Sequence, residues 1–116
     1  MIRCKRGVSI VGLKPELLMG IYFAEQTYTE HGQEVMTVTA VRDGKHTANS
    51  LHYKGLACDL RTKDLPDETT KDNIFDQLRV LLNPLGFDVV FESRGLDNEH
   101  FHLEFDPADT EYNLTA

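Results

Sequence analysis

The chain has 116 residues, of which 41% are hydrophobic and 27% are charged, so one globular domain of ordinary composition is expected. Lysine and arginine number 12 against 19 aspartate and glutamate residues, which gives a net charge of -7. This acidic balance argues against DNA or RNA as a partner and against electrostatic attachment to anionic lipid. We predict a single domain over residues 1–116, a monomer, with neither nucleic acid nor a membrane as partner.

The two cysteines, Cys4 and Cys58, occur without a secretory signal, and this is more typical of a reducing compartment than of a disulfide framework. Gly12, Lys14 and Pro15 interrupt the N-terminal apolar runs. Neither a signal peptide nor a membrane span is therefore expected. The expected localisation is synthesis in the cytoplasm.

The first half of the chain predicts one helix and two strands. A helix is expected over about residues 15–31, because Pro15 suits its first turn and apolar side chains recur at helical spacing up to a His-Gly stop. The β-branched segment 34–41 predicts a strand that ends at an Asp-Gly turn signal. After a polar loop, alternation of apolar and polar residues over 56–61 predicts a half-buried strand.

The second half predicts a helix followed by two strands. Asp67 is the expected N-cap of this helix, and an Asn-Pro-Leu-Gly sequence from residue 83 terminates it. Alternating apolar residues predict strands over 87–91 and 101–105. This order of elements predicts the α+β class, with a small, largely antiparallel sheet and flanking helices.

The last predicted strand carries several groups that bind metals and transfer protons. Its period-2 alternation places the apolar residues on one face. The residues of the opposite face are His100, His102 and Glu104. An exposed strand would also carry polar residues, and two histidines and a glutamate at alternate positions make a functional face an equally good interpretation.

A second cluster precedes the half-buried strand, where residues 50–59 follow the pattern S-x-H-x-x-G-x-A-x-D. An E-x-x-H motif begins at Glu99, about forty residues further on. The two motifs together are the pattern of the zinc D-alanyl-D-alanine peptidases and the phage L-alanyl-D-glutamate peptidases. The sequence resembles this family, which shares its fold with the hedgehog signalling domain.

The resemblance implies a zinc ion bound by His52, Asp59 and His102. Two neutral imidazoles and one carboxylate leave the fourth position of a catalytic zinc for water. His52 and Asp59 are close in sequence, whereas His102 is far along the chain. Zinc binding is therefore expected to stabilise the fold as well.

The resemblance assigns the general base to Glu99, but strand alternation raises an alternative. In an unbroken strand Glu99 points away from His102, whereas His100 shares the face of His102. Either the strand begins after Glu99, which leaves this side chain free to turn into the cleft, or His100 is the base. We expect Glu99 to be the base and His100 to be an accessory group.

Two further residues are candidate substrate contacts. Ser50 matches a motif position thought to hydrogen-bond the substrate, although it also suits a loop cap. Arg42 lies near the place where the family often has an arginine that holds the substrate carboxylate, and a guanidinium matches a carboxylate well. Cys58 alternates with Asp59 and is expected to point into the core.

The resemblance implies a zinc metallopeptidase that hydrolyses the stem peptide of peptidoglycan. The bond is either L-alanyl-D-glutamate, as for a phage endolysin released through a membrane pore, or D-alanyl-D-alanine, as for a carboxypeptidase. The alternative is a non-catalytic, zinc-bearing binding module of the hedgehog type, and the presence of Glu99 favours the enzyme. A purely structural zinc prefers four protein ligands, for which His100 is the remaining candidate.

Overall fold

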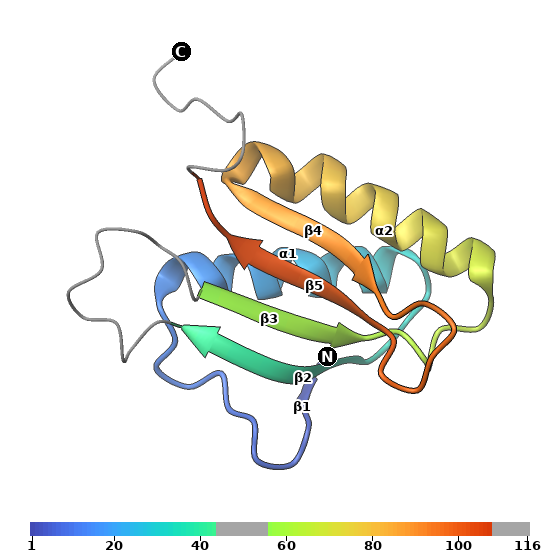
Figure 1. The fold of residues 1–116 in the computed structure, drawn as a ribbon, viewed down its shortest axis with the longest axis horizontal. Helices are drawn as coiled ribbons and strands as arrows, with labels where there is room; N and C mark the ends of the chain where they lie inside the picture. The colour runs from blue at the N-terminus through green and yellow to red at the C-terminus, as the bar shows by residue number, and fades with distance from the viewer. Residues whose placement is uncertain (44–55, 108–116) are drawn as a thin grey trace.

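The structure is a computed structural model that describes residues 1–43 and 56–107. Within these residues the chain forms a five-stranded mixed sheet and two α-helices (Figure 1). The elements in chain order are β1 (Ile2–Cys4), α1 (Pro15–Glu30), β2 (Met36–Asp43), β3 (Leu56–Arg61), α2 (Glu68–Leu82), a 3₁₀ turn (Asn83–Leu85), β4 (Phe87–Glu92) and β5 (His100–Phe105). The α+β prediction is therefore confirmed.

The strand order in the sheet is β1-β2-β3-β5-β4. The pairings β2–β3, β3–β5 and β4–β5 are antiparallel, so the prediction of a largely antiparallel sheet is confirmed. Strand β1 pairs in parallel with β2 and makes the sheet mixed. Strand β1 does not follow from the sequence pattern, because three residues are too few to display a period-2 alternation.

Both long helices begin as the sequence predicts. Pro15 occupies the first turn of α1, where the missing N–H costs no hydrogen bond. Asp67 caps α2, and its Oδ1 accepts a hydrogen bond of 2.7 Å from the backbone N–H of Thr70. None of the described helices is long and apolar enough to cross a membrane.

The two helices pack on the same face of the sheet and leave the other face open (Figure 1). The helices contribute Leu17, Ile21, Ala24, Tyr28, Ile74, Leu78 and Leu82 to the core. The strands contribute alternate residues to it, among them Leu56, Cys58, Leu60, Phe87, Val89, Phe101 and Leu103. The burial of Cys58 confirms its predicted orientation. The strand residues that alternate with these core positions point to the open face of the sheet.

Candidate metal centre

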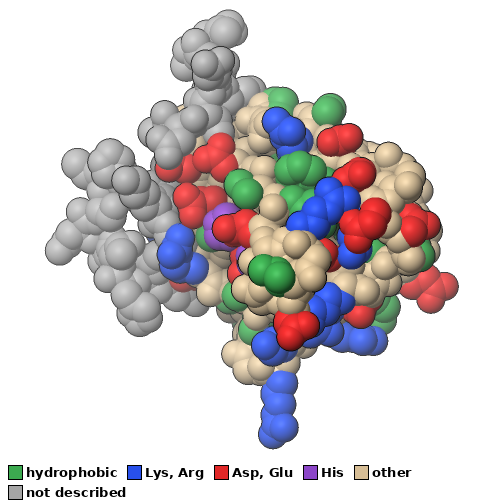
Figure 2. Space-filling view, turned by 45° about the vertical axis from the view of Figure 1, so that its right-hand side comes forward, with side chains coloured by type: hydrophobic (Ala, Val, Ile, Leu, Met, Phe, Trp, Pro, Cys, Tyr) green, Lys and Arg blue, Asp and Glu red, His purple; other side chains and the backbone are tan. Residues whose placement is uncertain are grey.

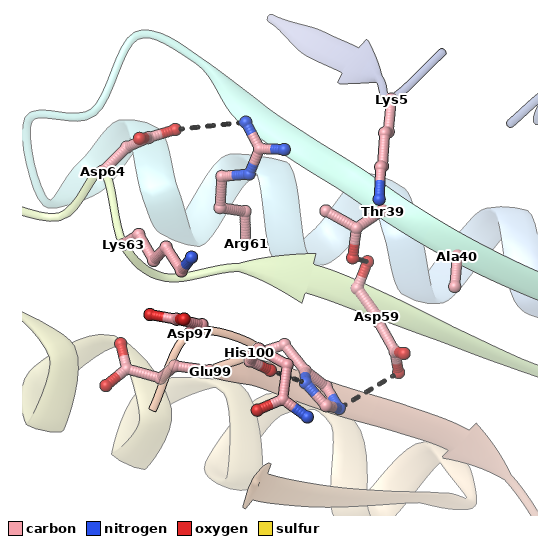
Figure 3. A pocket seen from close by; sticks show the side chains of 11 residues that line it. Lys5, Thr39, Ala40, Asp59, Arg61, Lys63, Asp64, Asp97, Glu99 and His100 are labelled. Carbon is pink, nitrogen blue, oxygen red and sulfur yellow. Dashed lines mark hydrogen bonds and ion pairs between the residues drawn. The ribbon is translucent and has the colours of Figure 1, made fainter. Parts of the chain in front are cut away.

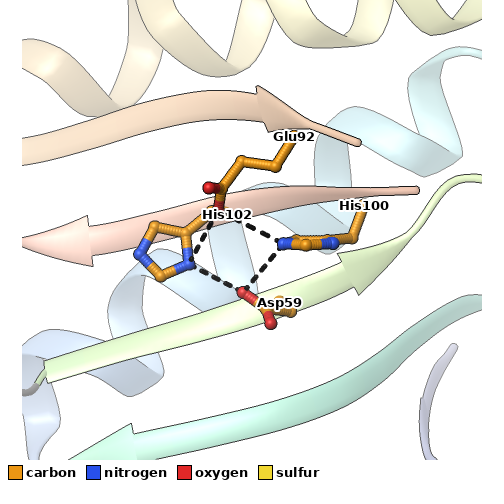
Figure 4. A group of neighbouring side chains, drawn as sticks. All are labelled: Asp59, Glu92, His100 and His102. Carbon is orange, nitrogen blue, oxygen red and sulfur yellow. Dashed lines mark hydrogen bonds and ion pairs between the residues drawn. The ribbon is translucent and has the colours of Figure 1, made fainter. Parts of the chain in front are cut away.

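Three adjacent strands bring ionisable side chains together on the open face of the sheet (Figure 4). Asp59 of β3 pairs with His102 of β5, and Glu92 of β4 pairs with His100 of β5. Paired residues in an antiparallel sheet direct their side chains to the same face. Asp59, Glu92, His100 and His102 therefore form one group, called here the metal cluster.

The ligand atoms of the metal cluster lie within 4.8 Å of one another. The Nδ1 atom of His102 lies 2.7 Å from Oδ1 of Asp59 and 3.7 Å from Oε1 of Glu92. The Nε2 atom of His100 lies 3.2 Å from Oε1 of Glu92 and 3.6 Å from Oδ1 of Asp59. One nitrogen of each imidazole thus faces the carboxylates of both Asp59 and Glu92 across one small space.

The hydrogen bonding of His100 shows why a cation suits this space. Nδ1 of His100 lies 2.6 Å from the carbonyl oxygen of Asn98, which can only accept, so Nδ1 donates. A neutral His100 then presents the lone pair of Nε2 to the carboxylates of Glu92 and Asp59. Three electron-rich atoms facing one another repel unless a proton or a metal cation lies between them.

The spacing of the metal cluster fits a small divalent cation. Ligand atoms about 2.1 Å from a tetrahedral zinc lie about 3.4 Å from one another. The separations of 3.2, 3.6 and 3.7 Å are close to that value. The 2.7 Å separation between His102 and Asp59 is that of a hydrogen bond, which a bound metal would replace. The cluster can therefore hold a metal ion, and its nitrogen and oxygen donors suit zinc among other transition metals.

Two side chains support His102 from the side away from the metal cluster. Nε2 of His102 lies 3.4 Å from Oε1 of Glu104, and the same oxygen accepts a hydrogen bond of 3.1 Å from Arg42. A carboxylate on the second nitrogen of a histidine ligand fixes its orientation and tautomer. The hydrogen bond with Asp59 raises the pKa of His102, and Glu104 adds to this effect. Arg42 reaches the site, where it is paired with Glu104.

Glu99 lies immediately before β5, so the strand does begin after this residue. Its carboxylate does not join the metal cluster. It is buried, with the side chain only 3% exposed, and it forms an ion pair of 2.8 Å with Lys71 of α2. It also accepts hydrogen bonds from the hydroxyl of Thr62 and from the backbone N–H of Gly95.

The environment of Glu99 makes its carboxylate a weak base. Burial raises the pKa, but the hydrogen bonds from Lys71, Thr62 and Gly95 outweigh it and lower the pKa of Glu99 to about 2. The carboxylate is therefore ionised and fully engaged near neutral pH. His100, in contrast, presents one ring nitrogen directly to the other members of the metal cluster.

Of the predicted site residues, the structure brings together Asp59, His100 and His102. Ser50 and His52 lie outside the described residues. Glu92 is not among the predicted site residues; it ends β4 and has no motif around it. Its alternation with Phe91 predicts that it faces away from the core, but only the pairing of β4 with β5 reveals that it lies opposite His100.

A groove of about 640 Å³ adjoins the metal cluster on the open face (Figure 3). Asp59 and His100 form part of its wall, and residues of β2 and of the segments that follow β1 and β3 form much of the rest. In Figure 2 histidine is visible at the surface among acidic side chains. A ligand in this groove would therefore contact the cluster.

The described residues thus define an α+β protein whose open sheet face bears a cluster of Asp, Glu and two His that can hold a metal ion. Comparison with protein-family models, with curated proteins and with solved structures gives no match for this chain. Its function is therefore inferred from the site and the motifs.

Proposed function

We propose that this protein is a zinc-dependent peptidase that hydrolyses a peptide bond in the stem peptide of peptidoglycan. One observation carries the proposal. Asp59 and His102 come from two separate motifs, 43 positions apart in the chain, and their side chains meet at 2.7 Å on an open surface. These are the two described residues that the motifs assign to zinc.

Asp59 and His102 are metal ligands of the proposed enzyme in both of two alternative ligand sets, which differ in the further donor. With His100 left free to act as the base, the described geometry supplies Glu92 as the further donor, whereas the motifs supply His52. A zinc ion held there would polarise the scissile carbonyl and lower the pKa of a bound water towards neutrality. Glu104 orients His102 through its second ring nitrogen.

In this proposal His100 receives the proton from the attacking water. A general base must lie within hydrogen-bond reach of that water. Nε2 of His100 faces the metal cluster while Nδ1 is fixed by the carbonyl of Asn98. Glu99 remains the alternative suggested by the motif, but its carboxylate is bound by Lys71, Thr62 and Gly95.

Digestion of purified peptidoglycan by the zinc-loaded protein, followed by mass spectrometry, tests the proposal. New L-alanine or D-glutamate ends indicate an endopeptidase, and loss of a terminal D-alanine indicates a carboxypeptidase. His102→Ala should abolish cleavage and weaken zinc binding. His31→Ala is the matched control, because His31 bonds Gln77 at 2.7 Å and lies outside the metal cluster.

The roles of the remaining donors can be separated by measuring zinc affinity and hydrolysis together. Loss of zinc affinity in Glu92→Gln would make Glu92 a ligand, and the same loss in His52→Ala would support the motif set. His100→Gln should retain zinc and lose hydrolysis if His100 is the base. If His100→Gln keeps full hydrolysis and Glu99→Gln loses hydrolysis, Glu99 is the general base.

The second candidate function is a zinc-bearing binding module without catalysis. It is favoured by the full engagement of Glu99, since the residue that the motif assigns to catalysis already has three partners. Zinc binding with no peptidoglycan fragments would support this alternative. Absence of bound zinc in the purified protein would contradict both functions.

A further inference from the structure

Three cationic side chains line the groove beside the metal cluster (Figure 3) and are called here the cationic wall. Lys5 follows β1, Arg61 ends β3, and Lys63 lies in the turn after β3. The chain has only 12 lysine and arginine residues and a net charge of -7. Three of the 12 therefore converge on a single groove of a strongly acidic protein.

The charges of these three residues are weakly compensated. Within residues 1–43 and 56–107, neither Lys5 nor Lys63 forms an ion pair, and both side chains belong to exposed residues. Arg61 approaches Asp64 at 3.9 Å, which is the outer limit of an ion pair. An exposed pair at that separation contributes little, so Arg61 remains available to an anion.

The carboxylates that line the groove do not neutralise the positive charge of the cationic wall. Glu99 is paired with Lys71 on its buried side, and Asp59 belongs to the metal cluster, where a divalent cation would neutralise it. Asp64 and Asp97 remain. The three cations outnumber these two, so the groove of the metal-loaded protein attracts an anion.

The spacing between Arg61 and Asp59 along β3 shows how far the cationic wall lies from a peptide bond held at the metal cluster. Arg61 is two positions after Asp59 and shares its face, and its Cα is paired with that of His100. Two residues of a strand span about 6.6 Å, and an extended peptide advances at a similar rate per residue. An anionic group one or two residues from a bond at the metal cluster would therefore reach Arg61.

We propose that Lys5, Arg61 and Lys63 form a subsite for a carboxylate of an acidic peptide, one or two residues from the bond held at the metal cluster. This inference rests on the proposed function and specifies the substrate class of the same site. Glutamate next to an alanyl bond carries such a group. Arg42, on the other side of His102, is already paired with Glu104 at 3.1 Å, so the groove is the stronger anion subsite.

The test compares two dipeptide probes by calorimetric titration of the zinc-loaded full chain in low salt. One is acetyl-L-alanyl-D-glutamic acid, and the other is the uncharged acetyl-L-alanyl-D-glutamine amide. Both carry an N-methylated central amide so that hydrolysis does not compete with binding. Because charge-assisted hydrogen bonds are roughly twice as strong as neutral ones, the acidic probe should bind about tenfold tighter.

The double variant Lys5→Gln/Lys63→Gln should reduce this preference to about threefold or less, without changing zinc content or the affinity for the neutral probe. Lys14→Gln is the matched control, since Lys14 is an exposed lysine outside the groove. Equal affinity for both probes, no measurable binding, or the same loss in Lys14→Gln would overturn the subsite.

The titration is independent of catalysis, so the two proposals can fail separately. If the charge preference is found but peptidoglycan is not cleaved, the subsite stands and the peptidase proposal fails. If peptidoglycan is cleaved but the double variant keeps the full preference for the acidic probe, the subsite fails and the peptidase proposal stands.

Discussion

Replacement of Glu99 by glutamine should reveal how much the ionised Glu99 carboxylate, with its partners Lys71, Thr62 and Gly95, stabilises the fold. Glu99→Gln removes the charge that Lys71 approaches at 2.8 Å and preserves the shape of the side chain. The pKa of Glu99 is about 2 in the folded protein against an ordinary value of 4.5. Since each pKa unit corresponds to about 1.4 kcal/mol, the ionised carboxylate contributes about 3 kcal/mol near neutral pH.

The pH dependence of this contribution follows from the direction of the shift. The pKa is lower in the folded state, so the unfolded chain binds more protons between about pH 4.5 and pH 2. The contribution is fully present above pH 4.5 and is lost as the pH falls towards 2. At pH 3 about half of it should remain.

Urea unfolding of the wild type and of Glu99→Gln at several pH values measures the effect. The variant should be about 3 kcal/mol less stable at pH 7 and nearly equal to the wild type at pH 2. Lys71→Met should also destabilise at pH 7, because it leaves the Glu99 carboxylate buried without its cation. Lys14→Met, at an exposed lysine, should have little effect. A deficit in Glu99→Gln that is the same at pH 2 and pH 7 would refute the reasoning.

Three further predictions concern the metal cluster and the core. Glu104→Gln should lower metal affinity about 10-fold to 100-fold, since it weakens the support of His102; unchanged affinity in a chelator competition would exclude this role. Glu92→Gln should weaken metal binding while leaving the urea unfolding midpoint of the metal-free protein nearly unchanged, and equal affinity would exclude Glu92 as a ligand. Gly20→Ala should cost about 1–3 kcal/mol in urea unfolding, because its Cβ would lie 2.6 Å from the buried ring of Phe87; a neutral result would show that the ring can move.

The sequence alone determined much of the fold. The long helices and four of the strands follow from local signals, such as Pro15 at the start of α1 and the Asp67 cap of α2. The alternation in β5 correctly separated the core residues from His100 and His102. These features depend on neighbouring residues only, so the printed sequence contains the information needed to find them.

Only the tertiary structure decided which strands lie side by side. The pairing of β4 with β5 brings Glu92 to His100, and no motif indicates this contact. The tertiary structure also decides the partner of Glu99. Its motif suggests catalysis, but its carboxylate forms an ion pair with Lys71 of α2. A short sequence pattern specifies residue types and spacing, whereas the packing of distant segments determines which partner neutralises each buried charge.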